Sequence, residues 1–495
     1  MVKKGEPSIR GTFFPADSAI SINGVEAMYS VKHIFIKAIL IGLLALLLGW
    51  LAIAFPQAMS GTSNLVFPFL VLASIAGLFA AAFLLLLRWE HHLFIFALSA
   101  GFQLYDPSPY ELMFFILVIS VFIKRVQLNR DMFKNVLALL LYIFLFFGTV
   151  SLFFAANFSK AAVWHGITVF LVCSGLFLVL AIKNDKHLEF FLKGYIAGAV
   201  ANSVLGIAGY VSNKNLGNST RLEGFFQDPN IFSPYLIIAL LLVLEDSLNP
   251  KLFASRSFKY LSIALLAGAV VLAMSRAGWI NLAGSLAVYL AIKMLKGELK
   301  PSFVIKSFLV PSSLLVSVYF LFPAITNQFI KLLVERTTLQ TYDNERFNAQ
   351  LFAVKVLKSN YFGIGPGEMT SIYYMDPHNT YLRLFAEYGW IAGISLLLLL
   401  VIQAGFLIKR SISCDKNKFN FHLVLLCSMA GSLVNILVVD ALHWRHFWIL
   451  FGLCCYAILY QKDESAEVIR TETGCLEQKS ASIGDSLNNF PKQRG

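Results

Sequence analysis

The segment GWIAGISLLLLLVIQAGFLI, residues 389–408, carries no charged side chain and is long enough to cross the hydrocarbon core of a bilayer as one helix. Apolar runs of this kind recur along the whole chain of 495 residues. Hydrophobic residues make up 58% of the chain and charged residues 14%, against about 45–50% and about 25% in soluble globular proteins. A soluble core cannot bury this excess, so the composition excludes a soluble enzyme, a secreted domain and a disordered scaffold. It predicts an all-α, polytopic integral membrane protein.

Apolar runs that approach the length of about 20 residues needed for a membrane span occur fourteen times. We expect about 12–14 transmembrane helices, because two of the runs are short and the Asp106-Pro107-Ser108-Pro109 link between them is also compatible with a re-entrant break. The runs cover residues 34–55, 64–87, 91–105, 109–123, 133–155, 161–182, 188–210, 231–246, 258–274, 277–295, 304–326, 389–408, 420–440 and 446–460.

Basic residues predict the orientation. With the N-terminus in the cytoplasm, every predicted inner loop carries Lys or Arg, as the positive-inside rule expects. The same rule accounts for the net charge of +12, so nucleic acid is not an expected partner. The predicted organisation is a cytoplasmic segment 1–33, transmembrane helices 1–11 over 34–326, a long extracytoplasmic loop 327–388 with amphipathic helices, transmembrane helices 12–14 over 389–460, and a polar, disordered cytoplasmic tail 461–495.

Arginines on the predicted outer face are not explained by the positive-inside rule. Arg221 precedes a helix that Asp228 or Asn230 is expected to cap. Arg276 lies where two apolar runs meet, and we expect it either to contact a phosphate or to pair with a carboxylate such as Asp228. Arg346 lies on a predicted amphipathic surface helix with its apolar residues at helical spacing, namely Phe347, Leu351, Val354 and Leu357.

A glycine-rich turn, Gly363-Ile-Gly365-Pro-Gly367, follows in the long loop. No Lys-Ser/Thr pair comes after it, so we expect the glycines to shape a tight turn and not to cradle phosphate. If residues 380–388 are helical, His378 lies at or just before the start of that helix. Arg383 and Glu387 are then four residues apart and can pair.

Two further histidines, His443 and His446, flank Trp444 and Arg445 at the predicted outer boundary. Such a group is typical of an anchor at the membrane interface. A contribution to an acceptor site is the alternative for one of these histidines.

Several guanidinium groups beside one histidine at a membrane surface predict a phosphorylated lipid as ligand. Guanidinium grips phosphate oxygens through two hydrogen bonds, and histidine can act as a general acid or base near neutral pH. Acidic residues on the outer side are scattered and the six cysteines lack metal-ligand spacing. We therefore expect neither a metal nor a cofactor.

The block that runs from Arg346 through Gly363-Ile-Gly365-Pro-Gly367 and His378-Asn379-Thr380-Tyr381-Leu382 to Glu387-Tyr388-Gly389-Trp390 resembles the signature region of the O-antigen ligase/polymerase family. The elements Arg221…Asp228-Pro229-Asn230 and Ser275-Arg276 resemble the upstream motifs of that family, in the same order. The likeness covers residues 200–405, and the other spans match only in hydropathy. The segment between the two principal arginines looks longer than in a typical ligase, which leaves the subfamily open.

This resemblance implies an enzyme of the bacterial cytoplasmic membrane whose active site faces outward. It would pass a glycan from an undecaprenyl-pyrophosphate donor to an acceptor sugar hydroxyl without a metal. A ligase would use lipid A core as acceptor, and a polymerase would use a growing polysaccharide. Arg221 and Arg346 would hold the pyrophosphate and His378 would act on the acceptor hydroxyl, with a substrate-binding set of Arg276, Asn379, Asn230 and Asp228.

The main alternative is a transporter or a lipid-linked oligosaccharide flippase. Such a protein is expected to carry charges near mid-span along its pathway and broken helices. The sequence has few charges within the spans, no internal repeat, and its arginines gather at one predicted face. A sensor or structural membrane protein would need neither the long outer loop nor the arginine–histidine set, so the transferase is the preferred hypothesis.

Overall fold

The structure is a computed structural model that describes residues 84–103, 107–128, 133, 135–212, 221–299, 302, 330–331, 334–335, 338 and 341–460. The described residues contain helices and no strand, which confirms the prediction of an all-α protein. The predicted segments 1–33, 34–55, 304–326 and 461–495, with most of 64–87, lie outside the described residues.

The chain separates into two compact units. The described part of the first consists of residues 84–88 and 118–125. The second, called the main unit here, contains residues 89–117 and the described residues from 126 onward, and it holds every residue discussed below.

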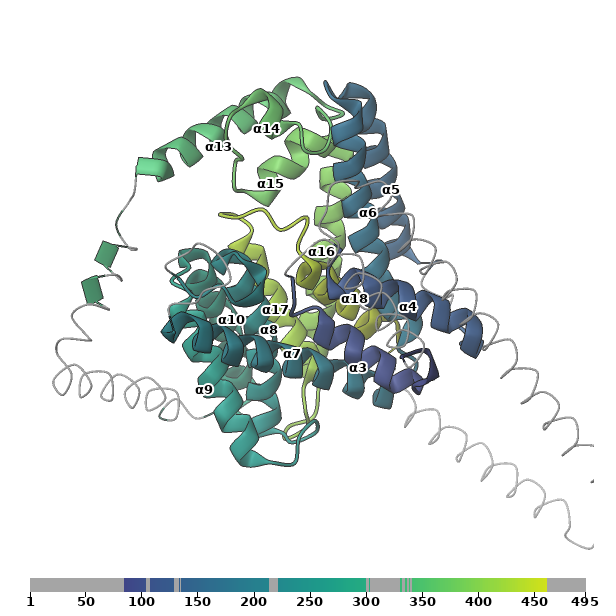
Figure 1. Cartoon of the computed structure of the whole chain (residues 1–495), viewed down its shortest axis with the longest axis vertical. Coiled ribbons are helices and arrows are strands. Elements are labelled where there is room, and N and C mark those ends of the chain that lie inside the picture. Colours follow the sequence, from purple (N-terminus) through teal and green to yellow (C-terminus); the bar gives the residue numbers. More distant parts are fainter. Residues whose placement is uncertain are drawn as a thin grey trace, which may run out of the picture. The chain divides into compact units, whose positions relative to one another are not determined.

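The described helices follow the predicted apolar runs, although α3 and α17 end earlier than expected, at Ser99 and Asn435. Figure 1 shows their arrangement. They are α3 (Trp89–Ser99), α4 (Pro109–Lys124), α5 (Val136–Ser151), α6 (Phe158–Ala181), α7 (Asp185–Val211), α8 (Pro229–Leu248), α9 (Arg256–Leu272), α10 (Arg276–Leu295), α13 (Thr341–Ser359), α14 (Met369–Ile372), α15 (Thr380–Arg383), α16 (Gly389–Ser413), α17 (Phe421–Asn435) and α18 (Arg445–Tyr460), with 3₁₀ turns η2 (Leu152–Phe154) and η3 (Gly224–Phe226) and a π-helical segment η4 (Leu384–Tyr388).

Six helical segments among the described residues are long and apolar enough to cross a membrane, which supports a multi-pass protein. α17 and α18 are apolar but shorter, and α3 and α4 have only 11 and 16 residues. The total number of crossings therefore stays a prediction. The six segments are Val136–Phe154, Phe158–Ala181, Asp185–Val211, Pro229–Leu248, Arg276–Leu295 and Thr380–Ser413.

Side-chain caps set the starts of several helices. Asp228 accepts a hydrogen bond from the Asn230 amide at 2.8 Å and Pro229 occupies the first position of α8. The prediction that Asp228 caps this helix is confirmed. Ser275 caps α10 through the Gly278 amide and also donates to the Asn230 side chain at 2.8 Å. One serine thus fixes the starts of α8 and α10 against each other.

α10 and α17 pack closely along a seam of small and polar residues. Gly431 of α17 faces Asn281 and Ser285 of α10 so closely that even a Cβ would collide with them. Asn435, next to the end of α17, is 1% exposed. Small residues that let helix backbones approach, together with polar groups between them, are the usual means of helix association in a bilayer.

A buried ion network joins the ends of α8 and α10 away from Ser275. Glu245 pairs with Lys293 at 3.0 Å and accepts a hydrogen bond from the Tyr289 hydroxyl at 2.6 Å. The adjacent Asp246 pairs with Lys259 of α9 at 3.0 Å. All five side chains are buried, so they compensate one another's charge or hydrogen-bonding needs as a set.

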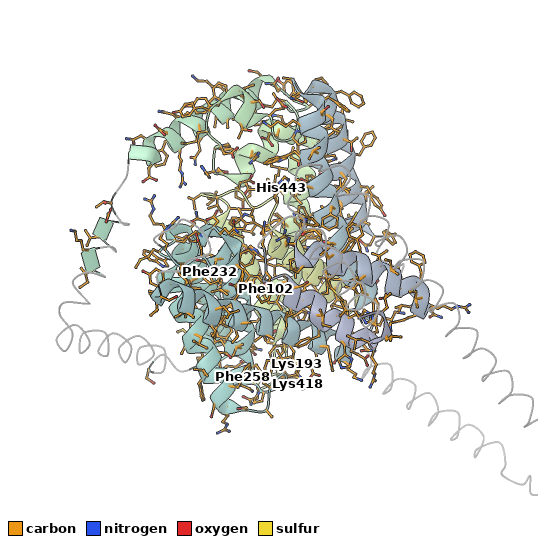
Figure 2. All side chains as sticks on the ribbon, viewed as in Figure 1. Phe102, Lys193, Phe232, Phe258, Lys418 and His443 are labelled. Atoms are coloured by element: carbon orange, nitrogen blue, oxygen red, sulfur yellow. The ribbon has the colours of Figure 1, made fainter. Side chains whose placement is uncertain are left out.

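Lys193 of α7 and Lys418, a residue of a predicted inner loop, lie toward one end of the main unit. Figure 2 places Lys193 and Lys418 together near Phe258, and His443 toward the opposite end. Figure 1 shows α13, α14 and α15 near one another in the upper part of the view. The predicted orientation of the chain in a membrane stays a prediction.

The glycine-rich turn of the long loop docks on η4. The amides of Ile364 and Gly365 donate to Ala386 and Glu387 carbonyls at 3.0 and 3.1 Å. Gly363 has a φ of +81°, and a Cβ there would collide with the Glu387 carbonyl. Gly365 and Gly367 also have positive φ. The predicted tight turn is confirmed, and its backbone requires glycine.

Substitution Gly363→Ala should lower the free energy of unfolding by roughly 1–3 kcal/mol, because it adds backbone strain and a collision with Glu387. Gly405→Ala in α16 is the matched control: a Cβ there meets open space, so the melting temperature should stay unchanged or rise slightly. Thermal melting of both variants in detergent measures the difference. Equal melting temperatures for the two would contradict the role given to Gly363.

Candidate functional site

A cavity of about 420 Å³ in the main unit brings together arginines that are far apart in the sequence. Arg221 precedes η3, Arg276 begins α10, and Arg346 lies on α13. His378 and Asn230 line the same cavity. The remaining lining residues are Met274, Ala277, Ile280, Asp343, Phe347, Gln350, Val438 and Val439.

Five of the seven predicted site residues therefore meet in one place. The other two, Asp228 and Asn379, are not among the lining residues and instead cap helices α8 and α15. Asn379 accepts a hydrogen bond from the Leu382 amide at 3.1 Å. Its position places it directly between His378 and the start of α15, so it fixes the backbone that presents the histidine.

Arg276 is held by a carboxylate, but not by the one suggested from the sequence. Its two terminal nitrogens donate to the two oxygens of Asp343 at 3.0 and 2.6 Å, a paired geometry. The suggested partner, Asp228, instead directs its side chain to the first turn of α8. The Arg276 side chain remains 31% exposed, while that of Asp343 is only 8% exposed.

Helix α13 presents Asp343 and Arg346 to the cavity from positions three residues apart. The helix predicted at this place is present, and its residues Ala353, Val356 and Leu357 pack against the long loop. Ala353 and Val356 are buried against Met369 and Ala386, whereas Phe347 and Leu351 of the predicted stripe are exposed. Packing against the loop thus determines the rotation of α13.

His378 adopts a backbone conformation that is rare for a residue with a side chain. Its φ is +44°, in the left-handed region, immediately before the Asn379 cap. Such strain persists where the surrounding structure requires it and is concentrated at functional sites. The predicted position of His378, just before the start of a helix, is confirmed.

The electrostatic surroundings favour a neutral His378. Burial, and then the Arg346 guanidinium, lower the pKa of His378 below its ordinary value of 6.5, although Asp376 and Asp440 act in the opposite direction. Near neutral pH the imidazole is therefore uncharged and able to accept a proton.

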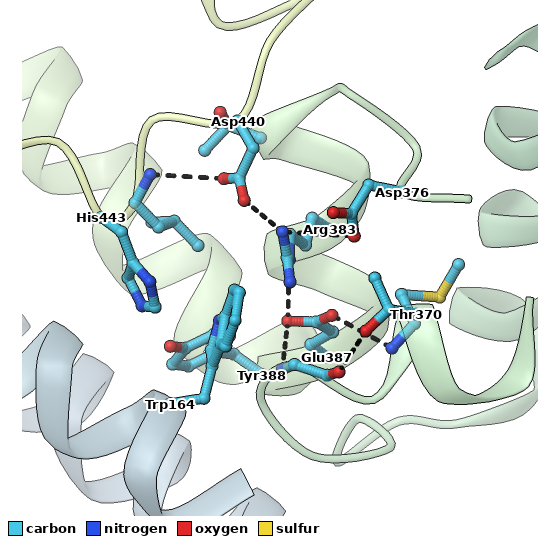
Figure 3. A network of polar contacts seen from close by, with 12 residues as sticks. Trp164, Thr370, Asp376, Arg383, Glu387, Tyr388, Asp440 and His443 are labelled. Atoms are coloured by element: carbon cyan, nitrogen blue, oxygen red, sulfur yellow. Dashed lines mark hydrogen bonds and ion pairs between the residues drawn. The ribbon is translucent and has the colours of Figure 1, made fainter. Parts of the chain in front are cut away.

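Arg383 is buried at the centre of a network of charged residues (Figure 3). Its Nε donates to Glu387 at 3.1 Å, its Nη1 pairs with Asp440 and lies 3.4 Å from Asp376, and its guanidinium stacks on Trp164 at 4.6 Å. The pairing of Arg383 with Glu387 predicted from their spacing is confirmed.

Glu387 carries this network on to the glycine turn. Its carboxylate accepts hydrogen bonds from the amides of Gly367 at 2.8 Å and Met369 at 3.1 Å. Glu387 is completely buried. One carboxylate thus joins the arginine network, the glycine turn and the π-helical segment before α16.

The link between α17 and α18 also holds the backbone next to His378, through hydrogen bonds to Thr380. Thr380 donates from its hydroxyl to Val439 O at 2.8 Å and accepts from the Ala441 amide at 3.0 Å. Val438 and Val439 of this link line the cavity. The cavity therefore combines apolar side chains with its arginines, as ligand sites commonly do.

His443 and His446 were expected to anchor the protein at the membrane interface. The structure instead places both histidines in the interior of the protein. His446 is 2% exposed, and His443 packs on Trp164 with ring centroids 4.5 Å apart. Burial lowers the pKa of His443 to about 4. Neither histidine is among the cavity-lining residues: His443 lies in the link after α17, and His446 lies in the first turn of α18.

Sequence reasoning missed Asp343 and Asp440. Both were visible as acidic residues on the outer side, but neither had a specific partner in the sequence. The spacing of three residues between Asp343 and Arg346 was the available signal, since it places both on one face of the predicted helix. No comparable signal connects Asp440 to Arg383.

No group of three or more His, Cys, Asp or Glu side chains that could hold a metal ion occurs within the described ranges of the chain. The expectation of a metal-independent reaction remains a prediction.

Comparison with known proteins gives one family match. Residues 261–397 match the family model described as O-antigen ligase. This region includes Arg276, Asp343, Arg346 and His378 of the cavity. No curated protein sequence matches the chain.

Substitution Arg383→Ala should lower the free energy of unfolding by roughly 3–5 kcal/mol, because it leaves the buried carboxylate of Glu387 without its counter-charge. Lys418→Ala is the control, since the Lys418–Asp415 pair is largely exposed and its loss should leave stability almost unchanged. Denaturation in mixed detergent measures both variants. A loss for Arg383→Ala no larger than for Lys418→Ala would show that the network does not stabilise the fold.

Proposed function

We propose that this chain, which its matched region assigns to the O-antigen ligase/polymerase family, transfers a glycan from undecaprenyl pyrophosphate to an acceptor sugar hydroxyl. The observation that carries the proposal is the convergence of Arg221, Arg276, Arg346 and His378 on one cavity. In this proposal the cavity opens at the outer face of the bacterial cytoplasmic membrane, and both termini are cytoplasmic.

Arg221 and Arg346 hold the pyrophosphate, and Arg276 is a further contact once its bond to Asp343 is shared. Guanidinium groups match phosphate oxygens in geometry and stay charged at all relevant pH values. They also stabilise the negative charge that grows on the leaving diphosphate. The apolar side chains of Val438, Val439 and Phe347 suit the first isoprene units of the lipid, next to its charged group.

His378 acts on the acceptor. The acceptor oxygen attacks the anomeric carbon of the donor while the bond from that carbon to the phosphate oxygen breaks. The electron pair of this bond leaves with the diphosphate, and the hydroxyl proton passes to the imidazole of His378. A neutral imidazole is needed for this step, and the lowered pKa of His378 supports it.

The choice between a ligase and a polymerase depends on the acceptor. Lipid A core as acceptor makes the protein a ligase, and a second lipid-linked repeat or growing polysaccharide makes it a polymerase. Asn230, which faces the cavity, is proposed to bind sugar, while Asp228 and Asn379 act by holding the helix starts next to it. Both outcomes use the same donor site.

Substitutions His378→Ala and Arg346→Ala should each lower transfer by about 10²-fold or more, because they remove the base and a pyrophosphate contact. Purified protein is incubated with undecaprenyl-pyrophosphate-linked repeat units and a chelator, with or without lipid A core, and products are followed by gel mobility. Lys355→Ala is the control, since Lys355 is exposed on α13 and outside the cavity lining.

Chain growth from donor alone would identify a polymerase, and transfer only with lipid A core would identify a ligase. Full activity in both active-site variants would contradict the assigned roles. Wild-type protein inactive with every acceptor would favour a flippase, which an assay of lipid flipping in liposomes would then detect.

Transfer should also depend on pH through His378. Because its pKa lies below 6.5, kcat/KM should be flat around pH 7 and fall as the pH drops through that lower pKa and the imidazole becomes protonated. An acid limb centred above pH 6.5 would contradict a base with these surroundings. The pH profile of the wild type measures this limb directly.

A further inference from the structure

A carboxylate lies inside the cavity that is proposed to bind a diphosphate. Asp343 lines the cavity, and its carboxylate accepts two hydrogen bonds from the Arg276 guanidinium at 3.0 and 2.6 Å. A carboxylate bound in this way uses the same two guanidinium donors that a phosphate would use. An anion on Asp343's side of the cavity therefore repels any phosphate group that enters.

The charges that line the cavity can be counted. Its described lining contains three arginines and one aspartate, which gives a net charge of +2 when His378 is neutral. A diphosphate esterified at both ends carries two ionised oxygens. A diphosphate with one free end has a further ionisable oxygen, with a pKa of about 6 by analogy with phosphate monoesters. It therefore approaches three negative charges at neutral pH.

Glycosyl transfer converts the first of these species into the second. The donor is a diester of diphosphate, because it joins both the lipid and the sugar. The lipid diphosphate that remains after transfer is a monoester. A cavity with three arginines and no carboxylate would bind the product more tightly than the donor, and slow release of product would then limit turnover.

We propose that Asp343 is a specificity-determining residue that matches the cavity to the diphosphate diester and weakens retention of the monoester product. This inference rests on the proposed function, since only glycosyl transfer interconverts the two species. Asp343 acts by charge within the cavity while it orients Arg276.

Other carboxylates nearby do not have this position. Asp376, Glu387 and Asp440 pair with the buried Arg383 and are not among the lining residues. Glu345 lies on the same helix two residues after Asp343, but it also is not among them. Glu345 is therefore a matched control: its removal changes the net charge of the protein equally without changing the cavity.

The experiment compares the affinities of two soluble probes for the full-length protein in detergent. Farnesyl diphosphate represents the monoester, and its methyl diester represents the donor. Titration calorimetry at pH 7.5 follows wild type, Asp343→Asn and Glu345→Gln. For Asp343→Asn we expect the monoester to bind at least about tenfold more tightly, with a smaller gain for the diester, because the lost repulsion scales with ligand charge. Glu345→Gln should bind both as the wild type does.

Other binding results would overturn the proposed function or the inference about Asp343. If the wild type binds neither probe, the proposed function is overturned together with the inference that rests on it. If the wild type binds both, the inference alone is overturned by equal gains for the two probes in Asp343→Asn, by no gain, or by the same change in Glu345→Gln.

Two further variants keep the test valid if Asp343→Asn does not fold. Asp343→Ser removes the same charge with a smaller side chain and should show the same preference for the monoester. Asp343→Glu keeps the charge and should keep the discrimination of the wild type.

In multiple-turnover assays, Asp343→Asn should lower kcat without raising KM for the donor, whereas loss of Arg276 orientation alone would raise KM.

Discussion

The guanidinium of Arg383 lies between carboxylates from three parts of the chain, with the indole of Trp164 against its face. A charge that is 2% exposed is tolerated only if partners surround it. The loss of any one partner of Arg383 would therefore leave a buried charge without full compensation. Glu387 passes the constraint to the glycine turn, and Asp440 passes it to the link between α17 and α18. The segment that carries His378 is thereby fixed from both sides.

This arrangement explains why strain can be stored at His378. A left-handed backbone at a residue with a side chain relaxes unless its neighbours are held, and here Asn379 and Thr380 are both fixed by hydrogen bonds. The arrangement also separates two tasks. Charges that stabilise the protein are buried around Arg383, while charges able to meet a ligand, those of Arg221, Arg276 and Arg346, line the cavity. The fold can therefore keep an electropositive cavity open without depending on a ligand to neutralise it.

Much of this could be predicted from the sequence because the signals are local. The apolar runs predicted the long helices, and the spacing of Arg383 and Glu387 predicted their ion pair. Asp228 before Pro229 predicted the start of α8. Contacts between distant segments could not be predicted in the same way. The partner of Arg276 is 67 residues away, and Asp440 is 57 residues from Arg383, distances at which no periodicity connects two positions. The packing of Ala353 and Val356 of α13 against the long loop could not be predicted for a related reason, since the helix sequence alone does not show which segment covers it.

The close seam between α10 and α17 has a mechanical consequence. Arg276 begins α10 and Val438 and Val439 follow α17, so these parts of the cavity lining are attached to two helices whose backbones nearly touch at Gly431. Their spacing is set by atoms that cannot be compressed, and not by flexible side chains. An added methyl group at Gly431, which does not line the cavity, would push α10 and α17 apart and thereby widen the cavity. The width of this part of the cavity is thus determined in the interior of a helix pair.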